Sequence, residues 1–588
     1  MTVTEIEKDL KVNNNDQKSE ENVEYLEPEK PKFSWRVVDN HSPPEIYNWT
    51  LYMSIFVFGI LGAARGLDEA NSAGIAVQKS FRDQFGLNDP NKSVHEIADL
   101  KSNITAMVQL GSIGGAVIAS FLVDWVGRVR SMQIVCVCWI VAVIIQITSR
   151  TLGQLYVGRL LEGLLAIGLT TTIGPTYISE VTPKAIRGMA GCIFAGAVYL
   201  GIMLSYFAHY GTAVHISQDS NTQWIIPNTL KIVFAGLIFI LSIFFCVESP
   251  RWYIKVGKNE TAVKALSKLR HLPETHPFLI GEITDITEQV EFEKRAKEGN
   301  TLWGLTLQLV RTKSMRYRFF MLSAMIHVLG QWSGANSVTI YAPELFGLSG
   351  IKGVETLKMT AVLGVVKFIG AYISAFFIID FLGRRKALYI GISLQMMALL
   401  FFALFLLLVP EAAHEGEQAS DLSPSQLHAS KAAMAAIYIS GLGWVTGFNS
   451  MQYLIGSEIF PINMRSFAQS ITMVVHFANQ YGNSKALPKM LLTLQPYGTF
   501  FFFVGVNFLA LTWAWFCIPE VSGRSLESME ELFNLPWYLI GRRGHILCPD
   551  HSEVNKIDYS KGKFRYLDKP ETEMHENASK ASDDKEDD

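Results

Sequence analysis

The sequence predicts an all-α integral membrane protein made of two similar halves, each containing six membrane-spanning helices. Three observations lead to this fold class. Long apolar segments recur along the chain, polar residues are confined to both ends and one central block, and two charged stretches each occur twice. With 49% hydrophobic and only 18% charged residues, the chain is too apolar for a soluble protein of 588 residues, in which polar linkers would separate several domains.

Twelve segments are long and apolar enough to cross a bilayer, which takes about 20 residues. The first six cover residues 50–75, 102–123, 131–149, 152–178, 189–210 and 225–247, and the second six cover 319–345, 359–380, 387–409, 432–455, 466–490 and 498–518. The segments 432–455 and 466–490 have polar interiors and are the weakest candidates.

These segments divide the chain into five parts. We expect a disordered tail (1–45), an N-terminal half (46–247), a linker (248–318), a C-terminal half (319–518) and a second tail (519–588). The first tail is polar and charged, and no cleavable signal peptide is visible in it. The linker has an amphipathic pattern interrupted at Pro273 and Pro277, which predicts short surface helices.

Two charged cassettes recur in the second half. The stretch 124–130 (DWVGRVR) returns as 380–386 (DFLGRRK), and 179–188 (SEVTPKAIRG) returns as 457–466 (SEIFPINMRS). The separations are 256 residues (380 − 124) and 278 residues (458 − 180). Such similar offsets indicate one duplicated unit with different insertions. Duplicated bundles of membrane helices are typical of transporters.

Basic residues in the short loops predict the orientation, because Lys and Arg are enriched on the cytosolic side. The loops after the second, fourth and eighth segments contain Arg128 and Arg130, Lys184 and Arg187, and Arg384, Arg385 and Lys386. We therefore expect these loops, both tails and the linker in the cytosol. Asn91 then falls in an outer loop within an Asn-Lys-Ser sequon, so it is the candidate glycosylation site.

Composition also excludes several classes of protein. The net charge of −3 includes no basic excess, so nucleic acid is not an expected partner. The six cysteines are scattered without metal-site spacing, and we expect neither a metal nor a cofactor. No nucleophile elbow or phosphate loop is visible, which argues against an enzyme.

The acidic members of the cassettes do nothing for orientation, so they predict a second role. A charge near the membrane is costly unless it is paired. We expect Glu180 and Arg187 to pair with Glu458 and Arg465 across the seam between the halves, closing the cytosolic side in one state and opening it in another. The alternative is that these charges only set the topology.

These cassettes and four further motifs resemble the sugar porters of the major facilitator superfamily over about residues 45–535. The further motifs are Gly158-Arg159, Pro175-x-Tyr177, Glu248-Ser-Pro250-Arg251 and Pro519-Glu520 followed by Gly523-Arg524. Shorter stretches, 43–49, 223–227, 269–273 and 364–367, are most similar to the fungal quinate-permease-like branch.

The resemblance implies the major facilitator fold: 12 transmembrane helices in two pseudo-symmetric halves, with substrate near the midplane and alternating access. It implies a monomer in the plasma membrane, or alternatively in the vacuole. It also implies a gating role for a set of charged residues. These are Asp124, Arg128, Glu180, Arg187, Glu248, Arg251, Asp380, Arg384, Arg385, Glu458, Arg465, Glu520 and Arg524.

The resemblance further implies proton coupling by Asp68 together with Arg159. A buried carboxylate beside a mobile cation can bind and release a proton. Alternatively, Asp68 belongs to a local ion network with Arg65 and Glu69 and the protein is an uncoupled carrier. A nutrient sensor without transport is a third possibility.

The positions that bind sugar in this family are largely rewritten. Gln331 and Asn336 match the family pattern, whereas Tyr199, Lys231, Tyr453 and His476 replace its other polar or aromatic residues. We therefore expect a substrate among monosaccharides, polyols and quinate-like sugar acids. Lys231, His476 and Arg65 add positive charge, which favours an acid. The alternative, that Lys231 pairs with Glu162 or Asp68 and contacts no substrate, is the more usual fate of a buried charge.

Overall fold

The described part of the chain consists of helices and their connections, without strands. The computed structural model describes residues 43–183, 186–297, 302–378, 384–410, 423–449, 451–452, 459–460, 462–519, 532–533 and 540–541. All of these belong to one unit, Asp39–Pro549. The predicted all-α fold class is confirmed for these residues.

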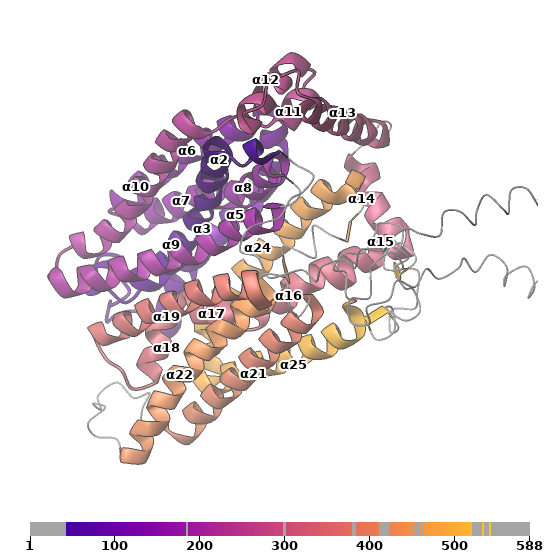
Figure 1. Ribbon diagram of the computed structural model, residues 1–588. Helices are drawn as coiled ribbons and strands as arrows, with labels where there is room; N and C mark the ends of the chain where they lie inside the picture. The colour runs from indigo at the N-terminus through magenta and orange to yellow at the C-terminus, as the bar shows by residue number, and fades with distance from the viewer. Residues whose placement is uncertain are drawn as a thin grey trace, which may run out of the picture. The chain divides into compact units, whose positions relative to one another are not determined.

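The N-terminal half begins with a short helix, η2 (Pro44–Ile46), and continues through long helices (Figure 1). These are α2 (Trp49–Ile60), α3 (Gly62–Ile75), α5 (Val94–Val126), α6 (Arg128–Ile147), α7 (Leu152–Glu162), η3 (Gly163–Ile167), α8 (Gly168–Val181), α9 (Arg187–His215) and α10 (Thr222–Phe245). A short α4 (Lys79–Gln84) lies between α3 and α5.

The linker forms short helices, as its pattern predicts. They are α11 (Pro250–Lys255), α12 (Asn259–Arg270), α13 (Pro277–Lys297), α14 (Leu302–Arg311) and α15 (Lys313–Arg316). The break between α12 and α13 contains Pro273, and Pro277 is the first residue of α13, where its missing N–H is tolerated. Arg270 and Glu282 join the two helices through an ion pair of 2.6 Å.

The C-terminal half has a broken first span followed by longer helices. It comprises η5 (Tyr317–Ala324), α16 (Met325–Trp332), α17 (Ala335–Ile340), α18 (Ala342–Leu348), α19 (Val354–Ile373), η6 (Ser374–Ile378), α21 (Arg384–Leu408), α22 (Pro424–Thr446), α24 (Ile462–Thr493) and α25 (Gln495–Cys517). The break falls at Gly334, whose φ of +92° lies in the left-handed region that favours glycine.

Nine helical stretches among the described residues are long and apolar enough to span a membrane. They are Pro44–Ile75, Val94–Val126, Arg128–Ile147, Leu152–Val181, Met189–His215, Thr222–Phe245, Val354–Ile378, Arg384–Leu408 and Gln495–Cys517. The other three predicted segments, 319–345, 432–455 and 466–490, correspond to the broken span and to the more polar helices α22 and α24.

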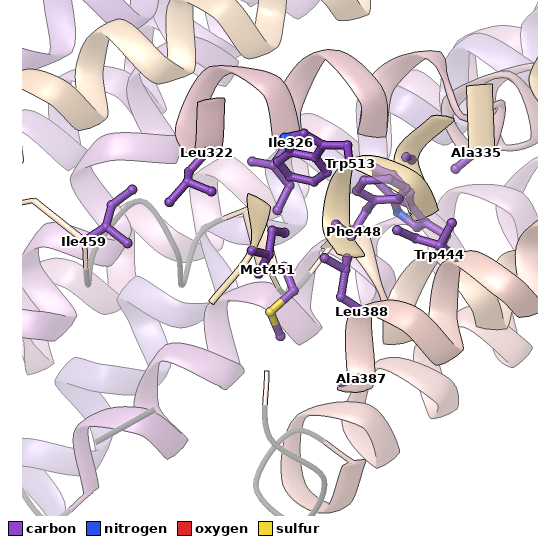
Figure 2. Packing of buried hydrophobic residues seen from close by; sticks show 14 of the residues in the cluster. Leu322, Ile326, Ala335, Ala387, Leu388, Trp444, Phe448, Met451, Ile459 and Trp513 are labelled. Atoms are coloured by element: carbon purple, nitrogen blue, oxygen red, sulfur yellow. The ribbon is translucent and has the colours of Figure 1, made fainter. Parts of the chain in front are cut away.

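Several helix pairs join the halves, and two of them make the most extensive contacts. α5 packs against α24, as Figure 1 also shows, and α9 packs against α19. One buried hydrophobic cluster crosses the same boundary, since it contains Tyr199 and Tyr206 of α9 together with residues of the C-terminal half. Figure 2 shows members of this cluster, among them Ile326, Trp444, Phe448 and Trp513. The central residues of both halves are therefore held against one another.

Candidate functional site

A cavity lies between the two halves, and residues of both line it. From the N-terminal half come Arg65, Glu69, Phe194, Ala195, Val198, Tyr199 and Ile202, and from the C-terminal half come Gln331, Asn336, Thr339, Trp444 and Asn449. The first group belongs to α3 and α9, and most of the second group belongs to α16, α17 and α22. A molecule bound here touches both halves at once.

A polar network forms one wall of the cavity. Arg65 pairs with Glu69 at 2.8 Å, and its Nη2 lies 3.0 Å from Nε2 of His476. The other ring nitrogen of His476 lies 3.3 Å from the amide nitrogen of Gln331. Gln480 donates to Glu69 and Asn336 at 3.1 and 3.2 Å. These contacts tie α3 to α24 and orient the amides that line the cavity.

Aromatic groups form another part of the lining. Trp444 donates from its indole Nε1 to the hydroxyl oxygen of Tyr199 at 3.1 Å, which links α22 to α9. Trp444 also packs near Phe448, with ring centroids 6.0 Å apart. A cavity lined by both aromatic rings and amides can bind the apolar face and the hydroxyls of a ring-shaped ligand.

A separate cluster of four charged side chains lies inside the N-terminal half. Lys231 on α10 contacts Asp68 at 2.8 Å and Glu162 at 3.0 Å, and Arg159 lies 3.8 Å from Asp68. Arg159 also donates to the hydroxyl of Ser72 at 2.5 Å. All four side chains of the cluster are nearly inaccessible to solvent. The cluster is balanced, because two carboxylates face two cations.

Neutral donors complete the coordination of Glu162. Trp139 donates to one carboxylate oxygen at 2.9 Å and Gln146 donates to the other at 2.8 Å. Because a buried carboxylate is costly unless its lone pairs are used, these bonds hold Glu162 in place between α6 and α10.

The structure thus separates the six predicted substrate residues. Tyr199, Gln331 and Asn336 line the cavity, and His476 lies behind its wall in contact with Gln331 and Arg65. Lys231 does not line the cavity and instead forms the ion pairs that were its alternative role. Tyr453 lies outside the described residues.

The residues of the first cassette form an ion-pair network centred on Arg128. Its guanidinium contacts Glu180 through two bonds of 2.9 and 2.7 Å, and Asp124 lies 3.4 Å away and also pairs with Lys255. Glu248 accepts bonds from the backbone N–H groups of Arg128 and Val129. The bidentate pair between Arg128 and Glu180 fixes the ends of α5, α6 and α8 relative to one another.

The environment of Glu248 has opposing effects on its proton affinity. Burial raises the pKa of its carboxyl group, and the backbone hydrogen bonds from Ser249, Arg128 and Val129 only partly offset that rise. Gly127, with φ of +103°, permits this approach, since a side chain at that position would collide with the carboxylate.

Glu180 pairs with Arg128 of the same half, because this arginine begins α6 and reaches the end of α8, and Glu180 also accepts a hydrogen bond from Ser249. The expected pairing across the seam with Arg465 stays a prediction, since that side chain lies outside what the structure describes. Arg251 joins the linker helices by contacting Glu293 at 2.5 Å. In the second copy, Arg385 donates to Tyr389 and to the carbonyl of Trp515. Arg384 begins α21. The remaining predicted gating positions lie outside what the structure describes: residues Asp380, Glu458, Glu520 and Arg524, and the side chains of Arg187 and Arg465.

The opposite end of α5 carries contacts that the sequence did not predict. Asp99 pairs with Lys489 of α24 at 2.8 Å, Lys101 pairs with Glu344 of α18, and Lys485 donates to Asn103. Asp99 and Asp124 are 25 residues apart on one helix (124 − 99), or about 38 Å at 1.5 Å per residue. The halves are therefore linked at the end of the bundle remote from the first cassette.

Comparison with known proteins agrees with this architecture. A family model described as "Sugar (and other) transporter" matches residues 54–533. The chain belongs to this transporter family. A "Probable quinate permease" of Neosartorya fischeri is 30% identical over 501 residues, covering 84% of this chain and 90% of the relative. The "Quinate permease" of Emericella nidulans is 29% identical, covering 85% of this chain and 91% of the relative.

Solved structures share the fold of the transporter. The xylose transporter XylE from E. coli in a partially occluded inward open conformation aligns with a TM-score of 0.66 at 19% identity, covering 82% of this chain and all of that chain. The proton:xylose symporter XylE bound to 6-bromo-6-deoxy-D-glucose aligns with a TM-score of 0.65 at 22% identity, with the same coverage of both chains. The transporter is accordingly a multi-pass membrane protein with the major facilitator fold.

Several cavity residues were not among the predicted site residues. Glu69, Thr339 and Asn449 line the cavity, and Gln480 bridges two of its walls. These residues could have been found in the sequence as polar residues inside otherwise apolar segments. Lys367, next to Thr339, carried the same signal within the segment 359–380.

Proposed function

We propose that the transporter carries a polyhydroxylated small molecule across the membrane by alternating access rather than catalysing a reaction. The substrate is a monosaccharide, a polyol or a quinate-like sugar acid. The observation that carries this proposal is a cavity lined from both halves, since a ligand that contacts both can be exposed to either side as they rock.

The chemistry of the lining supports a hydroxyl-rich ligand. Each hydroxyl can donate one hydrogen bond and accept others, and the amides of Gln331, Asn336 and Asn449 offer both kinds of partner. Oε1 of Gln331 is buried and has no partner among the described residues, so it is available to a ligand. The names of the relatives, which include quinate permeases, are consistent with this class.

We further propose that Asp68 carries a proton with the substrate. The charged and titratable groups around it are Lys231, Arg159, Glu162 and His209 from neighbouring helices and Arg65 and Glu69 on α3. A proton added to Asp68 leaves this balanced cluster with one excess positive charge. That excess weakens the attraction between α3 and α10 and couples protonation to helix movement.

An uncoupled carrier is the second candidate, and one observation favours it. Lys231 already neutralises Asp68 at 2.8 Å, so the carboxylate can stay ionised throughout the cycle. The two candidates differ in whether the substrate accumulates against its gradient.

A transport screen tests both proposals. Cells lacking their own porters express the transporter and receive labelled hexoses, polyols and sugar acids at two pH values. We expect concentrative uptake that is stronger at the lower pH, and Asp68→Asn should abolish accumulation while leaving exchange. Survival of accumulation with its pH dependence in Asp68→Asn would exclude Asp68 as the carrier, and high-affinity glucose uptake would contradict the altered cavity.

For the remaining predictions we propose a monomer in the plasma membrane, divided into the five parts given above, with both tails and the cassettes in the cytosol. The exposed Asn91, in a turn before α5, then faces outward and is open to glycosylation. Treatment with an N-glycosidase should lower the apparent mass of the wild type but not of Asn91→Gln. The first cassette then lies at the cytosolic gate.

A further inference from the structure

Lys367 is a buried lysine that forms no ion pair in the described part of the chain. It lies on α19, is 1% exposed, and donates to the hydroxyl of Thr339 at 2.5 Å. Its side chain packs beside Gly441 of α22, so it cannot extend to the surface as lysines near helix ends do. Lys358, earlier in the same helix, has the usual arrangement: it is exposed and pairs with Glu355.

The other buried charges near the centre of the described bundle are balanced. Arg65 and Glu69 neutralise each other, and the cluster of Asp68, Glu162, Arg159 and Lys231 contains two charges of each sign. Lys367 is therefore a surplus positive charge. Burying an ammonium ion without a partner costs several kcal/mol, so Lys367 either loses its proton or is stabilised as a cation when an anion binds beside it.

The position of Lys367 indicates where such an anion would bind. Thr339 lines the cavity, and its hydroxyl accepts the hydrogen bond from Lys367, so the ammonium group directly contacts a residue of the cavity wall. The Thr339 hydroxyl donates to the carbonyl of Ala335 at 3.0 Å, which leaves its lone pairs facing the lysine. A bound anion can replace this single neutral acceptor with a charged one.

We propose that Lys367 binds the carboxylate of a polyhydroxylated carboxylic acid, which makes the substrate of this transporter a hydroxy acid rather than a neutral sugar. The inference rests on the proposed transport function and assigns recognition of the substrate charge to Lys367, whereas Lys231, the candidate considered from the sequence, is neutralised by Asp68 and Glu162. The amides of Gln331 and Asn336 remain for the hydroxyl groups. A bound carboxylate balances the surplus charge and favours closure of both halves around the ligand.

Binding of three probes to the purified transporter tests this. The probes are quinate, its uncharged methyl ester and the neutral polyol inositol, measured by isothermal titration calorimetry. We expect the wild type to bind quinate about thirtyfold or more tightly than the ester, and Lys367→Met to remove that preference, because truncating one partner of a buried charge pair is costly. Lys367→Met should leave the affinity for the ester within about twofold of the wild type. Lys367→Arg keeps the positive charge and should retain much of the preference for quinate over the ester. Lys358→Met is the matched control and should behave as the wild type.

Equal affinity of the wild type for acid and ester would overturn the assignment, and this comparison needs no variant that might fail to fold. A preference for the acid that persists in Lys367→Met would also overturn it. In both cases binding of any of the probes leaves the proposed function standing. If no probe binds and none is transported, the proposed function itself fails and this inference fails with it.

Discussion

Lys231 shows how a single buried charge is satisfied in this bundle. One ammonium group contacts carboxylates from two other helices, Asp68 on α3 and Glu162 on α7. From the sequence, this pairing and substrate binding were two alternatives for Lys231, because both roles require a lysine on an interior helix face. Which carboxylate it meets depends on how α3, α7 and α10 are rotated, and that is set by packing across the whole half.

Removing this lysine should leave two buried carboxylates with only Arg159 to balance them. We expect Lys231→Met to lower the free energy of unfolding by about 3–5 kcal/mol, the cost of breaking a buried pair. Denaturant unfolding of the purified protein in detergent micelles measures this, with Lys358→Met as the exposed control. Adding Asp68→Asn to Lys231→Met should restore part of the loss, and an unchanged stability of the single variant would contradict the contacts described.

The amide of Gln331 is expected to act on the ligand rather than on the fold. Gln331→Leu keeps the size of the side chain but removes its hydrogen-bonding atoms from the cavity wall. We expect the affinity for the transported compound to fall about tenfold or more, because leaving a polar group of the ligand without its partner costs about 1–3 kcal/mol. Equilibrium binding measures it, and the exposed Gln218→Leu is the control. An equal loss of affinity in Gln331→Leu and Gln218→Leu would show that Gln331 makes no specific contact with the ligand.

At the scale of elements, apolar length and duplication were sufficient to place most helices. The exceptions have local causes. α5 begins at Val94, before the predicted segment, because Ser93 and Glu96 form a capping box. The segment 319–345 is split because Gly334 adopts a left-handed conformation against Phe503, a feature that hydropathy does not reveal.

Close packing of α3 and α9 gives the next prediction. A Cβ added at Gly66 would collide with the backbone carbonyl of Val198, so Gly66→Ala should separate the helices and destabilise the protein by about 1–3 kcal/mol. Gly236 on α10 has open space around it, and Gly236→Ala should be neutral or stabilising by up to about 1 kcal/mol. The thermal midpoints of both variants in one detergent provide the comparison. Equal midpoints would argue against the tight α3–α9 contact.

At the scale of the whole bundle, the sequence predicted two halves but not what joins them. It located the charged cassettes, yet it could not tell that Glu180 meets Arg128 of its own half, since both within-half and cross-half pairs satisfy the same charges. The ion pairs of Asp99 with Lys489 and Lys101 with Glu344 link the halves at the other end. These pairs could not be predicted from the sequence, because charges near helix ends have many possible partners.

These two ion pairs should bias the transporter toward the state that is closed at that end. We expect the double variant Lys101→Met and Lys489→Met to populate a state in which α5 and α24 separate there. Double electron–electron resonance measures the distance between spin labels at Val94→Cys and Leu494→Cys in a cysteine-free background. In the double variant the distance distribution should gain a longer component. Lys358→Met, which breaks an ion pair within α19, should not, and an unchanged distribution in the double variant would exclude a gating role for the pairs.

The most direct test of the account is transport by the purified protein in liposomes. Counterflow of labelled hexoses, polyols and hydroxy acids is measured for the wild type and for Gln331→Leu, against liposomes without protein. We predict that the wild type exchanges at least one hydroxyl-rich compound well above the protein-free background and that Gln331→Leu loses most of this exchange. Background rates for every compound, or full exchange by Gln331→Leu, would contradict transport through the cavity between the halves.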